Sequence, residues 1–254
     1  MNFEHIEVQI DDPVATITLD RPTKLNAITL TMLSELIEAA ERISDSDART
    51  VVLSGTGTSF SGGMDIETFS TGALAQPDPD IRYDAAKLGG QAATALEHMP
   101  QIAIAALCGH VVGGGIVLAA ACDLRIAEEN TLFSIPEVDI GIPLAWGGIE
   151  RLVREIGPAK TKELVLTCRP FSAEEAQHLG FVSSVVNEGE ALNAAMDLAE
   201  TIASKSRFAV TTTKLHVAEI LKGDLSRDDA MGLVAAVEDP AWVEHRDSYM
   251  EQFN

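Results

Sequence analysis

Two glycine-rich segments are the first residues of this chain that could do chemistry. They are residues 60–66 (FSGGMDI) and residues 109–115 (GHVVGGG), and each follows a short apolar run typical of a buried strand. Glycine lets a backbone turn sharply and lets a ligand approach it closely. A helix that begins at the glycine triplet would also direct unpaired N–H groups and the positive end of its dipole at a ligand.

Two neighbouring parallel strands that end in such segments can each direct one N–H group at the same oxygen atom. That arrangement is an oxyanion hole, and it stabilises an oxygen that gains negative charge during a reaction. Either segment alone is also what an ordinary tight turn requires. The inference of an oxyanion hole therefore rests on the presence of both segments.

Glu137 is the candidate acid or base, because it follows an apolar strand and Pro136 and precedes Val138, Ile140 and Ile142. Such a carboxylate is either desolvated beside a site or simply placed at the end of a strand. Desolvation raises the pKa of a carboxyl group and makes it a useful base or acid near neutral pH.

Other catalytic arrangements are missing from the sequence, including G-x-S-x-G, H-E-x-x-H, G-x-x-x-x-G-K-[ST] and G-x-G-x-x-G. His110 could act as a base, but its place beside the glycine turn favours a packed or loop histidine. Ser61 has no histidine nearby in sequence to activate it as a nucleophile. Cys108, Cys122 and Cys168 show no paired spacing, so neither a disulfide framework nor a metal site is expected.

Charge restricts the possible partners of this 254-residue chain. It has 39 Asp and Glu against 18 Lys and Arg, a formal net charge of −21, which argues against nucleic acid or an anionic membrane as a partner. The apolar run at 101–123 approaches the length of a membrane span, but four glycines and a histidine favour a strand, a turn and a helix in a soluble core. Acidic residues interrupt the first stretch, so we expect no signal peptide and a cytoplasmic protein.

Apolar periodicity predicts an α/β protein. The predicted strands cover residues 4–10, 14–19, 50–54, 101–108, 122–127, 131–135 and 181–186. The predicted helices cover residues 29–43, 83–99, 113–121, 146–156, 158–167, 172–179, 191–204, 207–222, 226–237 and 240–252. Strands that alternate with helices, followed by helices alone, indicate an α/β core over residues 1–190 and an α-helical C-terminal subdomain over residues 191–254.

In their order and spacing, the motifs resemble the crotonase (enoyl-CoA hydratase/isomerase) superfamily over nearly the whole chain. Residues 20–27 (DRPTKLNA) resemble the R-P-x-x-x-N-A loop, and residues 60–66 resemble the F-S-A-G-x-D-[IL] segment. Residues 109–123 are similar to G-x-x-x-G-G-G with a helix ending in C-D, and residues 127–152 are similar to the next signature. The resemblance implies a ββα spiral core, a C-terminal trimerisation subdomain and a homotrimer or a dimer of trimers.

The resemblance also assigns roles to particular residues. The N–H groups of Met64 and Gly114 would hold the thioester carbonyl of an acyl-CoA, which is the substrate, so no separate cofactor is implied. The residues expected to bind CoA are Lys24, Leu25, Ala27, Gly62, Asp65 and Ile66. The resemblance does not place the walls of the acyl pocket; our candidates for them are Val117, Leu144 and Trp146, although Trp146 is also compatible with plain core packing.

The sequence departs from the pattern of the family's hydratases at one position. Those enzymes carry two glutamates, at the positions that hold Val117 and Glu137 here. Adding water to a double bond needs one group for the water and another for the α-carbon proton, and valine can serve as neither. Asp139 could supply a second carboxylate only if the chain is extended there.

A single carboxylate can instead move one proton from C2 to C4 of a 3-enoyl-CoA. We therefore expect an enoyl-CoA isomerase with Glu137 as its one base. Two alternatives stay open: a hydratase in which Glu137 acts through water, and a non-catalytic acyl-CoA-binding protein. Glu137 argues against the second alternative, because binding alone does not require it.

Overall fold

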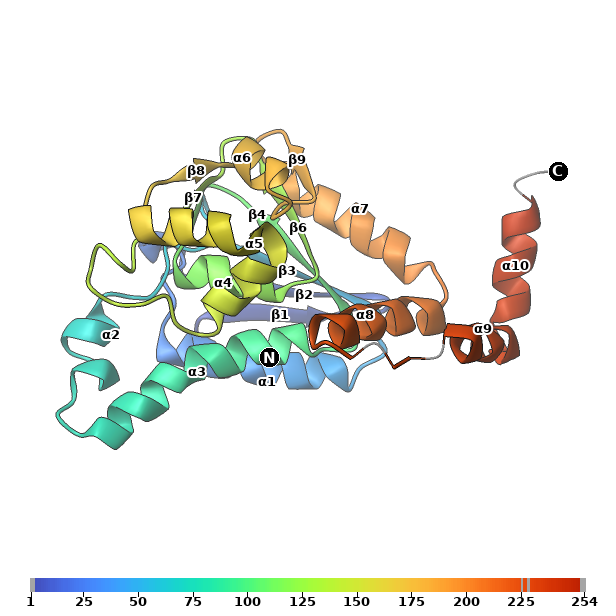
Figure 1. The fold of residues 1–254 in the computed structure, drawn as a ribbon, viewed down its shortest axis with the longest axis horizontal. Coiled ribbons are helices and arrows are strands. Elements are labelled where there is room, and N and C mark those ends of the chain that lie inside the picture. The colour runs from blue at the N-terminus through green and yellow to red at the C-terminus, as the bar shows by residue number, and fades with distance from the viewer. Residues whose placement is uncertain (1–2, 225, 228, 252–254) are drawn as a thin grey trace.

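The computed structural model describes residues 3–224, 226–227 and 229–251, and a six-stranded sheet lies at its centre (Figure 1). From one edge to the other the strands are β1 (Ile6–Ile10), β2 (Val14–Leu19), β3 (Thr50–Gly55), β4 (Ile102–Leu107), β6 (Leu124–Glu128) and β9 (Ser184–Val186). β1 and β2 form the predicted antiparallel hairpin, and every later pair is parallel. The carboxyl ends of β3, β4 and β6 therefore meet at one edge of the sheet, which is where open parallel sheets bind ligands.

A smaller three-stranded sheet lies beyond the carboxyl end of β4. It consists of β5 (His110–Val112), β7 (Leu132–Ser134) and β8 (Phe171–Ser172), with β5 and β7 parallel and β8 antiparallel to β7. The sequence predicted β7 but neither β5 nor β8. Both missed strands are too short to show an alternating pattern, and pairing with β7 is what makes them strands.

Helices cover both faces of the large sheet. Buried side chains on one face pack against α1 (Leu30–Ser44), α3 (Pro79–Glu97), α4 (Gly114–Ala121) and α5 (Gly148–Thr167). On the other face, Val52, Ile104 and their neighbours pack against α7 (Ala191–Ala203). The side chains of α7 in this contact are Ala191, Ala195 and Ala199, whose four-residue spacing places them on one face of the helix.

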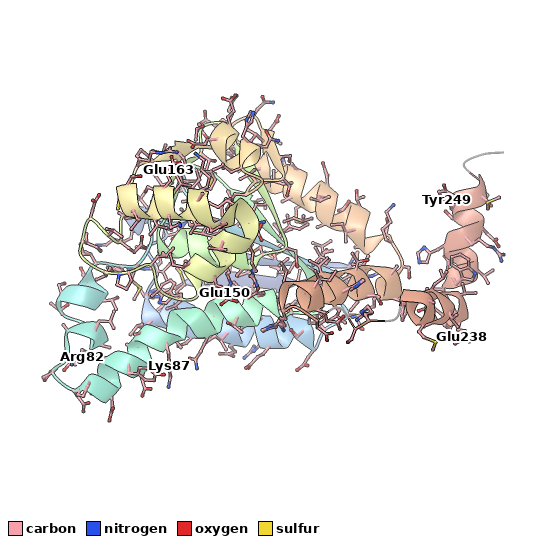
Figure 2. The ribbon with its side chains drawn as sticks, viewed as in Figure 1. Arg82, Lys87, Glu150, Glu163, Glu238 and Tyr249 are labelled. Atoms are coloured by element: carbon pink, nitrogen blue, oxygen red, sulfur yellow. The ribbon has the colours of Figure 1, made fainter. Side chains whose placement is uncertain are left out.

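The C-terminal helices fall into two groups by their packing. The boundary predicted at residue 190 places α7 with the C-terminal helices, whereas α7 packs as a layer of the core. Beyond it come α8 (Arg207–Leu221), α9 (Asp229–Glu238) and α10 (Trp242–Glu251), and α9 and α10 extend away from the body (Figure 1). Figure 2 shows Glu238 and Tyr249 on this extension, far from the sheet.

Most helix positions agree with the sequence prediction, and the differences have local causes. α3 begins at Pro79 instead of residue 83, because the Asp78 side chain accepts a hydrogen bond from the Asp80 N–H and proline suits the first helical turn. The predicted break between two helices at residue 157 is present as a kink in α5, where Gly157 has φ +75 before Pro158. The remaining α-helices are α2 (Glu67–Ser70), which the sequence did not predict, and α6 (Ala173–His178). Two short 3-10 helices, η1 (Pro22–Lys24) and η2 (Ala73–Ala75), complete the described helices. Among the residues described, no helix is long and apolar enough to cross a bilayer.

Candidate active site

The two glycine-rich segments run side by side because they pair as parallel strands. Ser61 forms a parallel bridge with Val111, and the Val112 N–H donates a hydrogen bond to the Ser61 carbonyl oxygen at 3.0 Å. Three residues further along each segment stand Met64 and Gly114. The pairing therefore carries the two residues expected to form the oxyanion hole to corresponding positions.

The N–H groups of Met64 and Gly114 have no acceptor within the part of the chain that the structure describes. Their neighbours do: the Gly113 N–H donates to Ser134 at 2.9 Å, and the Asp65 N–H donates at 2.8 Å. Buried backbone N–H groups almost always have a partner. Two such groups at one cavity are thus available to an oxygen of a ligand, and the Gly114 N–H also lies at the positive end of the α4 dipole.

Each glycine of the 113–115 triplet touches a different neighbour and leaves no room for a Cβ. The neighbours are the Glu137 carboxylate for Gly113, the Trp146 ring for Gly114 and the Ser61 side chain for Gly115. Gly113 also has φ +49, a conformation that side chains disfavour. The triplet therefore brings the N-terminus of α4 into direct contact with the candidate base.

A cavity of about 230 Å³ contains Met64, Gly114 and Glu137 in its lining. The other lining residues are apolar: Leu74, Ala85, Ala86, Val117, Ile142, Pro143, Leu144, Ala145 and Trp146. All three predicted catalytic residues and all three predicted acyl-pocket residues thus meet in one place. Within the described lining, Glu137 is the one side chain that ionises.

The Glu137 carboxylate is partly held out of water. Its Oε2 atom is buried and has no hydrogen-bond partner among the described residues. Burial raises the pKa of Glu137, although a hydrogen bond from its own backbone N–H opposes the rise. A carboxylate with an unpartnered oxygen and a raised pKa is equipped to accept a proton from a carbon acid in the cavity.

The other side chains considered as acids, bases or nucleophiles do not reach the cavity. Asp139 is exposed in a turn over residues 137–140, so the chain is not extended there, and His110 is exposed on β5. Ser61 is buried, and its hydroxyl donates to the Asn26 carbonyl oxygen at 2.9 Å and accepts from the Gly63 N–H at 3.2 Å. The Ser61 hydroxyl therefore stabilises the backbone of these segments.

The cysteines show no sign of reactivity or metal binding. Burial raises the pKa of the Cys122 thiol to about 12 and that of the Cys108 thiol to about 11, so both are protonated at neutral pH. In the described parts of the chain, no three His, Cys, Asp or Glu side chains gather as metal ligands.

The six residues expected to bind CoA lie on two segments, 21–28 and 60–66, that are hydrogen-bonded to each other. The Gly62 N–H donates to the Leu25 carbonyl oxygen at 2.6 Å. Asn26 is fully buried with φ +51, and its side chain donates to Thr56 at 2.9 Å and to Ser59 at 2.8 Å. Lys24, Leu25 and Ile66 are exposed on the surface of these segments, and none of the six predicted residues lines the 230 Å³ cavity.

The Asp65 carboxylate is used inside the protein. Arg21 donates to it at 2.8 Å and also to the Ala27 carbonyl oxygen at 2.6 Å. Burial acts to raise the pKa of Asp65, but the hydrogen bonds from Arg21 and the Glu67 N–H hold it below its usual value. A charged pair thus joins segment 21–28 to segment 60–66, which the sequence motifs did not reveal.

Trp146 is held in place by a network that sequence reasoning missed. The residue has φ +59, and its carbonyl oxygen accepts a hydrogen bond from Arg151 at 2.9 Å. Arg151 and Arg154 both pair with Glu97 on α3. Burial acts to raise the pKa of Glu97, but the two guanidinium groups hold it below its usual value. The one feature of the sequence that could have indicated this network is the pair Gly89-Gly90 inside a predicted helix.

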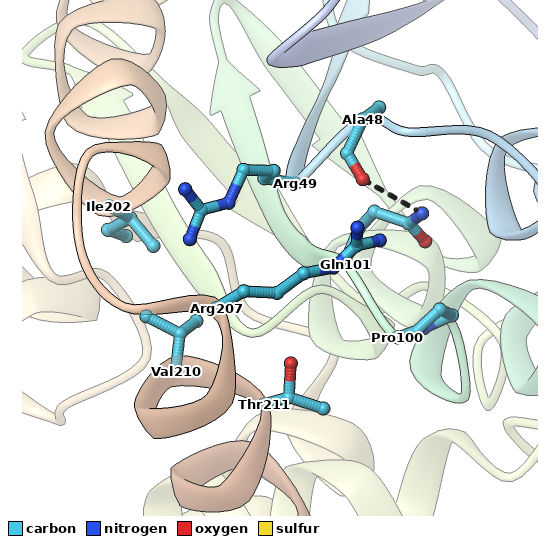
Figure 3. Close-up of a pocket in the computed structure, with 8 residues that line it drawn as sticks. All are labelled: Ala48, Arg49, Pro100, Gln101, Ile202, Arg207, Val210 and Thr211. Carbon is cyan, nitrogen blue, oxygen red and sulfur yellow. Dashed lines mark hydrogen bonds between the residues drawn. The ribbon is translucent and has the colours of Figure 1, made fainter. Parts of the chain in front are cut away.

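A second hollow lies at the opposite edge of the sheet (Figure 3). It has a volume of only about 10 Å³ and lies among Arg49, Gln101 and Arg207, at the amino ends of β3 and β4. The Gln101 side chain donates to the Ala48 carbonyl oxygen at 3.1 Å. This hollow contains none of the predicted site residues, and it is about large enough for one water molecule.

Comparison with known proteins identifies the family of the chain. The family model for enoyl-CoA hydratase/isomerase matches residues 9–234. The chain belongs to the enoyl-CoA hydratase/isomerase family. It is therefore an enzyme of a family that acts on acyl-CoA thioesters, as the motifs predicted.

Relatives in the enoyl-CoA hydratase/isomerase family include both isomerases and hydratases. The mitochondrial Delta(3,5)-Delta(2,4)-dienoyl-CoA isomerase of Rattus norvegicus is 36% identical over 244 residues, which cover 92% of this chain and 74% of that protein. Crotonyl-CoA hydratase of Syntrophomonas wolfei is 33% identical over 246 residues, which cover 94% of this chain and 93% of that protein. The crystal structure of enoyl-CoA hydratase from Bacillus anthracis matches with a TM-score of 0.86 at 29% identity, over 98% of this chain and 97% of that chain. The predicted crotonase-like fold is thereby confirmed.

Proposed function

We propose that this protein is an enoyl-CoA isomerase that shifts the double bond of a 3-enoyl-CoA to the 2-position with Glu137 as its one base. The observation that carries the proposal is the lining of the 230 Å³ cavity, in which a single carboxylate with an unpartnered oxygen stands among apolar walls. The unpaired N–H groups of Met64 and Gly114 line the same cavity and supply the place for the thioester oxygen.

The proposed reaction moves one proton and one double bond. The thioester oxygen accepts hydrogen bonds from the Met64 and Gly114 N–H groups, and Glu137 removes a proton from C2. The electrons of the broken C–H bond form an enolate, whose negative oxygen these donors stabilise by about 3 kcal/mol each. Glu137 then returns the proton to C4, the C3–C4 double bond becomes single, and the C2–C3 bond becomes double.

The single carboxylate favours transfer between nearby carbons. C2 and C4 are separated by one carbon, so one carboxylate group can reach both. A shift across a conjugated diene, as the name of the Rattus norvegicus relative describes, moves the proton across a longer stretch of the chain. Val117, which is buried against the cavity, supplies no second base for that reaction.

Hydration is the second candidate function, because crotonyl-CoA hydratase is 33% identical over nearly the full length of both chains. In this protein Glu137 would have to act through a water molecule. Such a water could bond to the unpaired Glu137 oxygen, but the apolar Val117 offers no second side-chain group to hold it, which is why the isomerase is favoured.

The proposal extends to the rest of the substrate and to assembly. Lys24 on the exposed surface of segment 21–28 would offset the negative charge of CoA phosphates against an acidic chain, and the backbone of the paired segments would contact the nucleotide. We also propose that α8, α9 and α10 pack against other copies of the chain in a homotrimer or a dimer of trimers.

Glu137→Gln tests the catalytic assignment. We expect isomerisation of a 3-enoyl-CoA, followed by the ultraviolet absorbance of the conjugated product, to fall about 10²–10⁴-fold while the affinity for a saturated acyl-CoA is kept. The matched control is Asp139→Asn, which removes an exposed carboxylate two residues away and should leave the rate unchanged.

Three outcomes would contradict the assignment. Near wild-type isomerisation by Glu137→Gln would remove Glu137 from the reaction. Hydration of crotonyl-CoA that is faster than isomerisation would favour the hydratase. Tight binding of acyl-CoA with neither reaction would indicate a non-catalytic binding protein.

A further inference from the structure

Trp146 lies between the candidate active site and a larger groove, which is distinct from the small hollow among Arg49, Gln101 and Arg207. Trp146 lines the 230 Å³ cavity and also a groove of about 790 Å³ that runs between α3 and α5. Ala86 is the other residue common to both linings. Apart from these two, the groove has its own lining, which includes Thr94, Glu97, Arg151 and Arg154.

Two glycines make room for the Trp146 ring. A Cβ on Gly89 of α3 would overlap the five-membered part of the indole, and a Cβ on Gly114 of α4 would overlap its six-membered part. The indole is therefore wedged between two helices. Glycine inside a helix costs about 1 kcal/mol relative to alanine, so the fold tolerates Gly89 in order to seat this ring.

The backbone of Trp146 is also fixed. Its φ of +59 is uncommon for a bulky residue and is followed by Gly147 at φ +71. The hydrogen bond from Arg151 to its carbonyl oxygen and the pairing of Arg151 with Glu97 at 2.5 Å tie this turn to α3. The ring is thus a fixed part of the cavity boundary.

We infer that Trp146 is the wall that closes the acyl cavity and sets the longest acyl chain the enzyme accepts. The inference rests on the proposed function, since it takes the 230 Å³ cavity as the place of the acyl chain. The cavity must take both the reacting carbons and the rest of the acyl chain, so its limited volume bounds the length of the chain.

Removal of the ring would join the cavity to the groove. The long side chains of Arg151 and Arg154 bring apolar stems as well as charged ends to the groove, and such stems can cover an alkyl chain. A longer acyl chain could then pass from the cavity into the groove. Leu144 lines the cavity but not the groove, so its truncation enlarges the cavity without opening it.

The test is the binding of saturated acyl-CoA thioesters, which requires no turnover. Titration calorimetry would measure Kd for a straight-chain series from butanoyl- to dodecanoyl-CoA with the wild type, Trp146→Gly, Trp146→Phe and Leu144→Ala. Glycine adopts the positive φ of position 146 without strain, so Trp146→Gly is expected to fold. If it does not fold, Trp146→Phe carries the test through a smaller shift.

In the wild type, each added methylene should tighten Kd about fourfold until the cavity is full, at a length within the series, and no further. In Trp146→Gly the tightening should continue beyond that length, so that the ratio of the octanoyl to the dodecanoyl Kd rises at least about tenfold above the wild-type ratio. Leu144→Ala should move the limit by one or two carbons only.

A limit that stays in place in Trp146→Gly, or a wild type with no limit over the series, would overturn the inference. If the chain-length limit moves as expected but no 3-enoyl-CoA is isomerised, the role of Trp146 as the wall is supported and the isomerase assignment fails. If the wild type isomerises but the limit does not move, the wall alone fails. A wild type that binds no acyl-CoA overturns both.

Discussion

At Gly113 the space that a side chain would fill is taken by the carboxylate of Glu137. This contact places the candidate base against the start of α4, where the Gly114 N–H is unpaired among the described residues. The two halves of the proposed chemistry, a base and an oxyanion site, are therefore adjacent residues in space. Their distance is set by packing rather than by a flexible loop.

At the residue scale, the raised pKa of Glu137 predicts the pH dependence of the reaction. Burial disfavours the charged form, and only the charged form can remove the C2 proton. We therefore expect kcat/KM to fall as the pH drops through a midpoint above the ordinary glutamate value, about 4.3. Since the folded state favours the neutral carboxyl, the contribution of this group to stability is full below its unfolded pKa and is lost as the pH rises through its folded pKa.

A pH–rate profile of the wild type measures this midpoint. Trp146→Gly would admit water to the carboxylate and should lower the midpoint, while Asp139→Asn should leave it in place. A wild-type midpoint at or below the ordinary value would contradict a desolvated base.

At the scale of elements, α3 and α4 are positioned by the aromatic ring between them. The adjacent glycines of α3 differ in their surroundings: a Cβ on Gly89 would overlap the Trp146 indole, whereas a Cβ on Gly90 would lie 3.6 Å from the nearest atom of that residue, an ordinary contact. The ion pairs of Glu97 with Arg151 and Arg154 fasten α3 to α5 next to the same ring. The proposed wall of the acyl cavity therefore lies where three helices meet.

This difference predicts opposite effects for two neighbouring substitutions. Gly90→Ala should raise the stability by up to about 1 kcal/mol, because alanine suits a helix interior better than glycine. Gly89→Ala should lower it by about 1–3 kcal/mol, because the added methyl group overpacks the ring. Thermal unfolding at matched protein concentration measures both. Similar shifts of the unfolding temperature, with the same sign in both variants, would contradict the inference that the Trp146 ring is wedged against Gly89.

At the scale of the whole molecule, the C-terminal helices expose much apolar surface. α8 and α10 bury none of their described side chains. The exposed apolar residues of α8, α9 and α10 include Leu215, Val217, Ile220, Leu221, Leu233, Val234, Val237 and Val243. Apolar surface of this extent on an extended arm indicates a protein–protein contact. The proposed trimer would cover it.

The proposed assembly predicts a mass of three or six times the 27.1 kDa of one chain. Leu233→Asp on α9, where the side chain is 68% exposed, should lower the mass measured by light scattering, because a charge cannot be buried in an apolar interface without a large cost. Leu192→Asp on α7 is the matched control, since that leucine is also exposed but lies on the core layer. A wild type with the mass of one chain would contradict the assembly.

Long elements could be predicted from the sequence, and contacts between distant residues could not. The apolar spacing within Leu30–Ser44 reveals a helix because many turns repeat the same pattern. β5 and β8 have three and two residues and show no pattern of their own. The ion pair of Arg21 and Asp65 joins residues 44 positions apart, and the two motifs that contain them do not show that these side chains meet.

The candidate site likewise has one part that could be predicted from the sequence and one part that could not. Glu137, Met64 and Gly114 could be proposed because family motifs mark their positions, and the structure places them in one cavity. Their roles stay predictions until activity is measured. The position of the Trp146 ring could not be predicted, because it depends on contacts with Gly89 and Arg151 that form only in the folded chain.

The pairing of Ser61 with Val111 has a consequence for how this enzyme could change its reaction over time. The proposed oxygen-binding donors are main-chain groups that strand pairing positions, so no exchange of a side chain removes them directly. The groups that move protons are side chains, and mutation can replace them one at a time. A lineage can therefore acquire a new reaction by altering Val117 or Glu137 while it keeps the ability to stabilise a thioester enolate.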